Sequence, residues 1–317
     1  MRWFALLLFL VAGVTSAQDY PARPLRLVLP QPPGGAVDFI SRTLGATLQK
    51  SIGQAIVVDN KPGANGIVAA EFVAKSAADG YTLFMAVDTN LVVNPNLYAK
   101  VPYDPFRDFA PISVIARNGL VLVANNGFAP NNVAEVIAYA RANPGKVNYA
   151  SIGYGSQHHL GMELFKAMAQ IDIVHVPYKS QAAALSDIAQ GVASIGLSGT
   201  PAALALSKAG QLKILAVTSL ERSKYLPQLP TMAESGLPGY DVAGWFGLLA
   251  PANTPAPVMA KLDHEVHKAM DDAEFRAALL KVGLDPVAST SAEMLALMKL
   301  DTEKWAKVIR DSGARIE

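Results

Sequence analysis

One loop of the sequence has a composition suited to binding an anion. Residues 30–35 read Pro-Gln-Pro-Pro-Gly-Gly and lie between a short apolar run, residues 25–29, and an amphipathic helical pattern. A loop in this position directs unpaired backbone N–H groups and the positive end of a helix dipole outward. Glycine permits positive φ and close approach of a ligand, which we expect at Gly35. The loop predicts a binding place for a carboxylate or phosphate, although a purely structural turn would have the same composition.

Two acidic residues lie near this predicted anion-binding loop. Asp38 falls in the first turn of the following helix, where we expect it to accept hydrogen bonds from loop N–H groups and stiffen the loop. Asp88 follows another apolar run, and it either points away from the ligand or accepts a donor from it.

Three histidines raise the alternative of a metal site. Glu163 lies one helical turn beyond His159, and His158 and His175 are the other candidates. The chain has 0 cysteines and no His-Glu-x-x-His spacing. The favoured interpretation is a His159–Glu163 pair on one helix face and a hydrogen-bonded His175 near a strand end, with no metal and no cofactor.

Serine chemistry gives the enzyme alternative, a secreted α/β hydrolase acting on a small ester. Residues 196–200, Gly-Leu-Ser-Gly-Thr, fall one glycine short of the Gly-x-Ser-x-Gly motif. Ser156 precedes two histidines, but its expected role is to cap a helix over residues 157–169. Residues 153–156 lack the Gly-Lys-Ser/Thr of a phosphate loop. A transient interaction protein without a small ligand is a third class.

Strand-like and helix-like segments alternate along the chain, which predicts an α/β fold built from βαβ units. Most of the apolar runs are short and β-branched, as in the strands of a buried parallel sheet. Asn132 and Glu135 resemble a capping box that opens a helix. Strands are expected at residues 25–29, 55–58, 82–87, 112–115, 120–123, 147–150, 173–176, 194–197, 213–218 and 246–249.

Proline-rich stretches at residues 101–105 and 251–255 flank a central block. This arrangement predicts two lobes joined by two crossovers, with a ligand cleft where strand ends and helix N-termini meet. Lobe 1 is expected to comprise residues 18–122 and 246–317, and lobe 2 residues 123–245.

The N-terminus has the pattern of a signal peptide. Arg2 precedes an apolar run, and small residues at 15 and 17 predict cleavage after Ala17, which would place the mature protein in the periplasm. Without Arg2, basic and acidic residues are equal at 26 each, which indicates no nucleic-acid partner. The apolar run is short for a membrane span. Hydrophobic residues make up 51% of the chain, enough for a sizeable core.

A series of motifs resembles the Bug-type receptors of tripartite tricarboxylate transporters. The matching segments run in the family's order through nearly all of the mature chain: residues 32–38, 59–64, 79–83, 94–95, 102–104, 149–156, 159–160, 175–179, 237–240 and 245–247. Three positions depart from the usual pattern: Gln31 replaces an aromatic residue, Ser180-Gln181 a glycine, and Ala193-Ser194 an acidic residue.

The resemblance implies a type II periplasmic-binding-protein fold that closes by hinge motion on a small organic acid. It also implies a non-enzymatic receptor that serves a membrane transporter. We expect the receptor itself to be monomeric. In such receptors the carboxylate is commonly held by backbone amides, hydroxyls and bridging waters. No arginine clamp is expected, because no isolated arginine lies in any of the predicted loops. The expected binding residues are Gln31, Pro32, Pro33, Gly34, Gly35, Asp38, Asp88, Thr89, Asn90, Ser151, Tyr154, Gly155, Ser156, Ser198, Gly199 and Thr200.

Overall fold

The apolar runs form strands much as the sequence predicts. A computed structural model describes residues 20–314, and the strand bounds at 25–29 and 82–87 agree with the sequence to the residue. The predicted signal peptide lies outside the described residues. The strands are β1 Leu25–Leu29, β2 Ile56–Asn60, β3 Thr82–Val87, β4 Phe109–Asn125, β5 Asn148–Ser151, β6 Val174–Pro177, β7 Ile195–Gly199, β8 Leu212–Val217, β9 Ala243–Pro251 and β10 Asp285–Pro286.

Helices follow most strands, and α4, α5, α6, α9 and α10 begin at polar side-chain caps. Asn132 accepts a hydrogen bond from Glu135 N, and Ser156 accepts one from His159 N, so both predicted N-caps are present. The predicted capping box is incomplete, because Glu135 accepts from Asn131 N and not from Asn132 N. A π-helical turn, Thr89–Val93, follows β3. The helices are α1 Ala36–Ile52, α2 Ile67–Ala74, α3 Asn94–Leu97, α4 Val133–Ala142, α5 Gln157–Ala169, α6 Gln181–Gln190, α7 Thr200–Lys208, α8 Ala256–Met270, α9 Ala273–Lys281 and α10 Ser291–Ser312.

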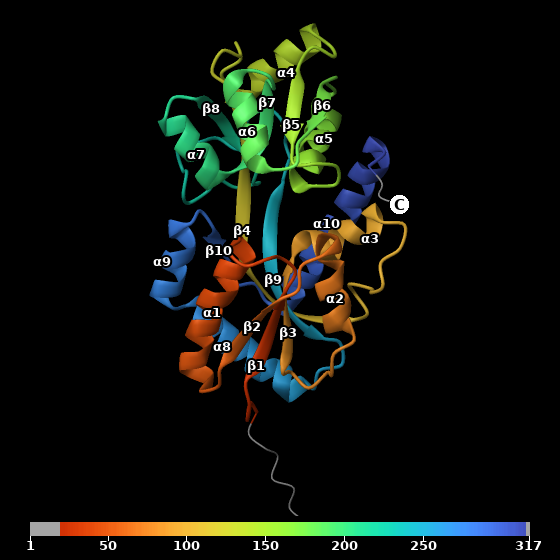
Figure 1. Ribbon diagram of the computed structural model, residues 1–317, viewed down its shortest axis with the longest axis vertical. Coiled ribbons are helices and arrows are strands. Elements are labelled where there is room, and N and C mark those ends of the chain that lie inside the picture. The colour runs from red at the N-terminus through yellow and green to blue at the C-terminus, as the bar shows by residue number, and fades with distance from the viewer. Residues whose placement is uncertain (1–19, 315–317) are drawn as a thin grey trace, which may run out of the picture.

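The strands divide into two groups, one in each of two lobes stacked along the long axis (Figure 1). In the lower lobe of the figure, which holds β1 to β3, the strand order is β2-β1-β3-β9-β4; in the upper lobe it is β4-β7-β5-β6, with β8 on the other edge of β4. Pairing among β1, β2 and β3 is parallel, as it is among β5, β6 and β7. The structure is therefore the predicted two-lobe α/β binding-protein fold.

Two long strands, β4 and β9, run between the lobes (Figure 1). Both pair antiparallel with their neighbours, so the expectation of a parallel sheet was wrong for the crossing strands. β4 pairs with β9 up to Gly119 and with β7 from Leu120, which makes it a member of both sheets. The predicted divisions at 122/123 and 245/246 fall inside these strands, and the exact residue at which the lobes divide stays a prediction.

The apolar core is continuous between the lobes on one side. It includes Phe84 from lobe 1, Leu160 from lobe 2 and Trp245 from the crossing strand β9, all 1% exposed or less. Separate clusters lie under α1, α8 and α9 in lobe 1 and under α6 and α7 in lobe 2. Helix α10 contacts both α3 and α5, so it also connects the lobes. None of the helices within residues 20–314 is long and apolar enough to span a membrane.

Candidate functional site

A polar cavity of about 510 Å³ lies between the lobes, within the size range of small-molecule sites. Six of the residues predicted from the sequence line it: Gln31, Asp88, Thr89, Tyr154, Gly155 and Ser156. An adjoining hollow of about 150 Å³ includes Pro32 and Asn90. Hollows of about 550 and 950 Å³ lie on the outer helix pairs α5/α10 and α6/α7, but they contain none of the predicted residues. The inter-lobe cavity is therefore the candidate site.

The predicted anion-binding loop borders this cavity through Gln31 and Ala36, the first residue of α1. The loop's positive φ, +93°, is at Gly34. Gly35 has φ −84° and would meet only Gln31 Oε1, at 3.4 Å, if it carried a Cβ. The expectation of positive φ at Gly35 is therefore wrong, and close approach of a ligand there stays a prediction. No side chain caps α1, and its first N–H groups stay available to an anion at the loop. Pro33, Gly34 and Gly35 themselves are not among the residues that line the cavity.

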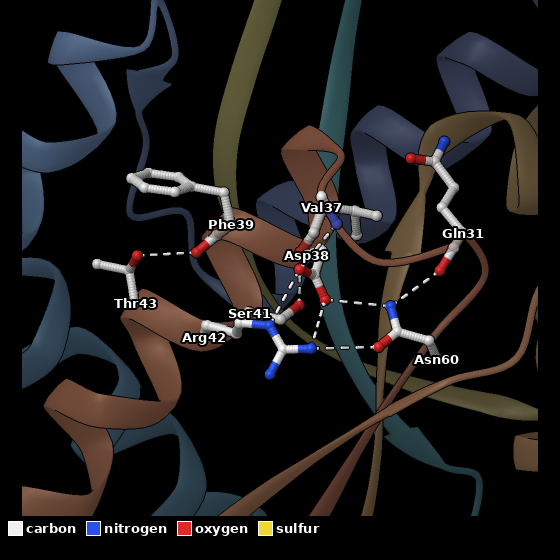
Figure 2. A network of polar contacts seen from close by, with 9 residues as sticks. Gln31, Val37, Asp38, Phe39, Ser41, Arg42, Thr43 and Asn60 are labelled. Carbon is white, nitrogen blue, oxygen red and sulfur yellow. Dashed lines mark hydrogen bonds and ion pairs between the residues drawn. The ribbon is translucent and has the colours of Figure 1, made fainter.

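Asp38 stiffens the anion-binding loop from inside, as the sequence predicts. One carboxylate oxygen accepts a hydrogen bond from Gly34 N at 3.0 Å, and the group is also bound by Arg42 and by Asn60 Nδ2 (Figure 2). Hydrogen bonding by Arg42 is the largest of the effects that lower the pKa of Asp38 to about 2. Asp38 is saturated by these partners and does not line the cavity. Arg42 is bound to Asp38 and Asn60 and does not line the cavity.

Gln31 contributes its backbone and its side chain to different neighbours. Its carbonyl oxygen accepts a hydrogen bond from Asn60 Nδ2 at 2.9 Å. Its side-chain amide extends away from the Asp38 network in Figure 2, and it lines both the cavity and the adjoining hollow. The amide is therefore available at the position where the family usually has an aromatic ring.

Asp88 lies at the end of β3 and faces lobe 2 across the cavity. It is 3% exposed; Oδ1 accepts from Thr89 N at 2.7 Å and Oδ2 from Gln157 Nε2, on α5 of the other lobe, at 3.3 Å. Burial, reinforced by the negative charge of Asp301, raises the pKa of Asp88 to about 7. A carboxyl group that resists ionisation repels a bound anion less than an ordinary aspartate would, so Asp88 is compatible with an acidic ligand.

Asn90 has a structural task beside the cavity. Its side-chain oxygen accepts from Val87 N at 3.0 Å and its amide donates to Asn65 O at 2.9 Å. Asn65 has φ +51° and also donates to Asn94 Oδ1 at 2.7 Å, so these three asparagines hold the β3 end against the segment before α2. Asn65 lines the cavity and is a residue that sequence reasoning missed.

Ser151, His159 and His175 form a cluster behind Tyr154, which lines the cavity. Ser151 Oγ is 2.6 Å from His175 Nε2, the His175 ring stacks on Tyr149, and Tyr154 meets it edge-on. Burial lowers the pKa of His175 to about 4. Glu163 accepts hydrogen bonds from Tyr149 and Lys166 instead of pairing directly with His159. Within residues 20–314 no group of three His, Cys, Asp or Glu side chains has an arrangement that could hold a metal ion.

The serine of the hydrolase alternative lies away from the cavity. Ser198 is fully buried on β7 and its hydroxyl donates to Gly199 O at 3.1 Å. Thr200 donates to Gly119 O at 3.1 Å, next to the cavity residue Asn118. Ser198, Gly199 and Thr200 thus support the crossing strand β4, and they do not line the cavity.

Sequence reasoning missed several residues that line the cavity. Asn118 lies in the middle of β4, where a polar residue followed by glycine resembles a turn between two strands. Gln157 and His158 lie in the first turn of α5, directly after the predicted Ser156. The signal that could have found them is their position, because a helix whose N-terminus faces a cleft presents its first turn to the ligand. Phe246 supplies an apolar wall.

The charge of the cavity is unusual for an anion site. The residues that line it, all within the described part of the chain, include no lysine and no arginine. Binding of an acid would therefore depend on the N-terminus of α1, on hydroxyls and on amides.

Comparison with known proteins places the chain among solute receptors. Residues 40–314 match the family model described as the tripartite tricarboxylate transporter family receptor. Protein BugT of Bordetella pertussis is 36% identical over 308 residues, covering 97% of this chain and 94% of that protein. The structure of R. palustris Rpa4515 with adipate superposes with a TM-score of 0.78 at 36% identity, covering 93% of this chain and 99% of that chain. MatC from Rhodopseudomonas palustris, with bound malate, gives a TM-score of 0.74 at 29% identity, covering 92% and 100%.

The family model spans most of the chain, and the two-lobe structure extends the agreement to the architecture. The chain therefore belongs to the Bug-type receptor family of tripartite tricarboxylate transporters.

Proposed function

We propose that this protein is a periplasmic receptor that captures a small organic carboxylate and delivers it to a tripartite tricarboxylate-type transporter. The observation that carries the proposal is the polar cavity of about 510 Å³ between two lobes that share the strand β4. A ligand that contacts α1 of one lobe and α5 of the other favours the closed conformation. The transporter would distinguish ligand-bound from free receptor by recognising this closed conformation.

The chemistry of the cavity supports a carboxylate as the ligand. The uncapped N-terminus of α1 offers N–H groups and a positive dipole end, and Asp88 resists ionisation. The adipate held by Rpa4515 and the malate held by MatC are acids of suitable size for this proposal. The mature protein would begin at Gln18, after removal of the predicted signal peptide.

A thermal-shift screen of organic acids tests the binding function. Ligand at one hundred times its Kd stabilises the folded state by about 2.7 kcal/mol, which raises Tm by several degrees. We expect at least one mono-, di- or tricarboxylate to do so without being consumed, as checked by product analysis. Turnover of the ligand would instead indicate an enzyme, and a screen without any stabilising acid would contradict the proposal.

The location and the partner need separate measurements. N-terminal sequencing of periplasmic material should start at Gln18, and an intact Met1 or membrane-bound protein would contradict secretion with cleavage. Uptake of the stabilising acid by cells should fall when the gene is deleted and should return with the wild-type gene. Unchanged uptake would contradict a role in transport.

A further inference from the structure

His158 has no evident structural task, although it is buried. It lies in the first turn of α5, is 8% exposed, and lines the inter-lobe cavity. Within the described residues neither Nδ1 nor Nε2 of its ring has a hydrogen-bond partner. Buried polar groups in folded proteins are almost always paired, so an exception calls for a functional explanation.

Among residues 20–314, the two neighbouring histidines each have one paired ring nitrogen, although Nδ1 of His175 is unpaired, whereas His158 has neither nitrogen paired. His159 Nδ1 accepts a hydrogen bond from Gly155 N at 3.2 Å, and His175 Nε2 lies 2.6 Å from Ser151 Oγ. His158 alone of these three faces the cavity. Both ring nitrogens are covered in this conformation, so a ligand reaches them only when the ring turns or the lobes close. With that movement, the ligand is expected to supply the missing partner.

His158 is an uncharged group at neutral pH. Burial lowers its pKa to about 4; the nearby amide of Gln181 opposes this shift, although no contact between the two side chains meets hydrogen-bond geometry. A neutral imidazole has one N–H donor and one nitrogen acceptor. It cannot attract a carboxylate by charge, but it complements a hydroxyl group, which can donate and accept.

We propose that His158 is a specificity-determining residue that hydrogen-bonds a hydroxyl group of the ligand, so that the receptor prefers hydroxy acids to the corresponding plain acids. This inference rests on the proposed carboxylate-binding function and names the ligand class of the same cavity. The acid group binds at the N-terminus of α1, and the hydroxyl group reaches α5 on the opposite lobe.

The test uses pairs of acids that differ by one hydroxyl group: malate and succinate, 2-hydroxyglutarate and glutarate, lactate and propionate. Titration calorimetry of the wild-type protein should give at least a tenfold preference for the hydroxylated member of the pair that binds, or about 1.4 kcal/mol. His158→Phe keeps a ring of similar shape and removes both nitrogens. It should abolish the preference by weakening the hydroxy acid tenfold, while affinity for the plain acid changes less than threefold.

Controls separate specificity from stability. His264→Phe makes the same substitution at an exposed position of α8, and both affinities should be unchanged. His158→Gln has a hydrogen-bond donor and acceptor, which His158→Phe lacks, and it should recover part of the preference for the hydroxy acid. If the phenylalanine variant does not fold, the glutamine variant alone tests the proposal, through a reduced preference relative to wild type. Equal weakening of both acids, or no change in their ratio, would overturn the role of His158 and leave the receptor function intact. Absence of binding by every acid to the wild-type protein would overturn both.

Discussion

Replacement of Asp88 by asparagine should change the pH dependence of stability in a defined direction. The folded protein holds a proton on Asp88 up to about pH 7, because burial and Asp301 raise its pKa from 3.8. The unfolded chain releases this proton near pH 4. The folded state therefore binds more protons between these values, and the contribution of Asp88 to stability falls as pH rises from about 4 to 7.

The size of the effect follows from the pKa shift. A shift of about three units at 1.36 kcal/mol per unit corresponds to about 4 kcal/mol at pH 8. Asp88→Asn cannot ionise, so it avoids the free-energy cost of a buried negative charge. Its amide oxygen can still accept a hydrogen bond from Thr89 N, and the side-chain amide of Gln157 can rotate so that its oxygen accepts from the new NH₂ group. We expect the variant to match the wild type near pH 4 and to be more stable by up to about 4 kcal/mol at pH 8.

Urea denaturation at several pH values from 4 to 8 measures this difference. The comparison must be between variant and wild type, because the lowered pKa values of His158 and His175 give the opposite slope in both proteins. Glu274→Gln, at a side chain that is 89% exposed and 4.0 Å from Lys50, is the control and should change stability by less than about 1 kcal/mol at any pH. A difference between Asp88→Asn and wild type that does not vary with pH, or a variant less stable at pH 8, would refute the reasoning.

Further predictions concern the anion-binding loop and the helix α5. Gly34→Val should destabilise the protein by about 1–2 kcal/mol because φ is +93°, whereas Gly35→Val at φ −84° should cost little; equal losses in urea denaturation would contradict this. Ser156→Ala should cost about 1 kcal/mol of stability through loss of the α5 cap, and an unchanged denaturation midpoint would argue against the cap. Asp38→Asn should lower the free energy of unfolding at neutral pH. Because the pKa of Asp38 is about 2 in the folded state and near 3.8 in the unfolded chain, its stabilising contribution is fully present above about pH 4 and is lost as the pH falls through 2; a difference from wild type that does not vary with pH would contradict the network around Asp38. EDTA should leave acid affinity unchanged in calorimetry, and loss restored by zinc would reveal a metal site.

The parts of the fold that the sequence predicts well are those with local signals. Pro30 follows β1 directly, and Ser156 caps α5, so both elements have the expected bounds. The crossing strand β4 was expected as two strands, at residues 112–115 and 120–123, and it is one. Arg117 and Asn118 interrupt its apolar pattern because they lie where the chain leaves one sheet for the other. In the sequence, the polar residue Asn118, which lines the cavity, therefore resembles a turn between two strands.

The candidate site was predictable where it depends on loops after strands. Asp88 and Tyr154 follow strands and reach the cavity, but Ser198 also follows one and turns its hydroxyl to a backbone carbonyl. Sequence does not reveal this difference, because it depends on how β7 packs against β4. The role of His158 was likewise hidden, since two adjacent histidines in a helix do not show which one is paired.

The pairing of β3 with β9 has a consequence for the order of folding. Phe84 pairs with Leu249, so the first lobe cannot complete its sheet until most of the chain has reached the compartment in which the protein folds. Until then the apolar strand β3 has an open edge, which is an opportunity for aggregation. The second lobe draws β5 to β8 from one continuous stretch of chain and needs no such delay. The lobe that begins nearer the N-terminus is therefore expected to complete its fold last, and the newly exported chain depends on protection of β3 in the meantime.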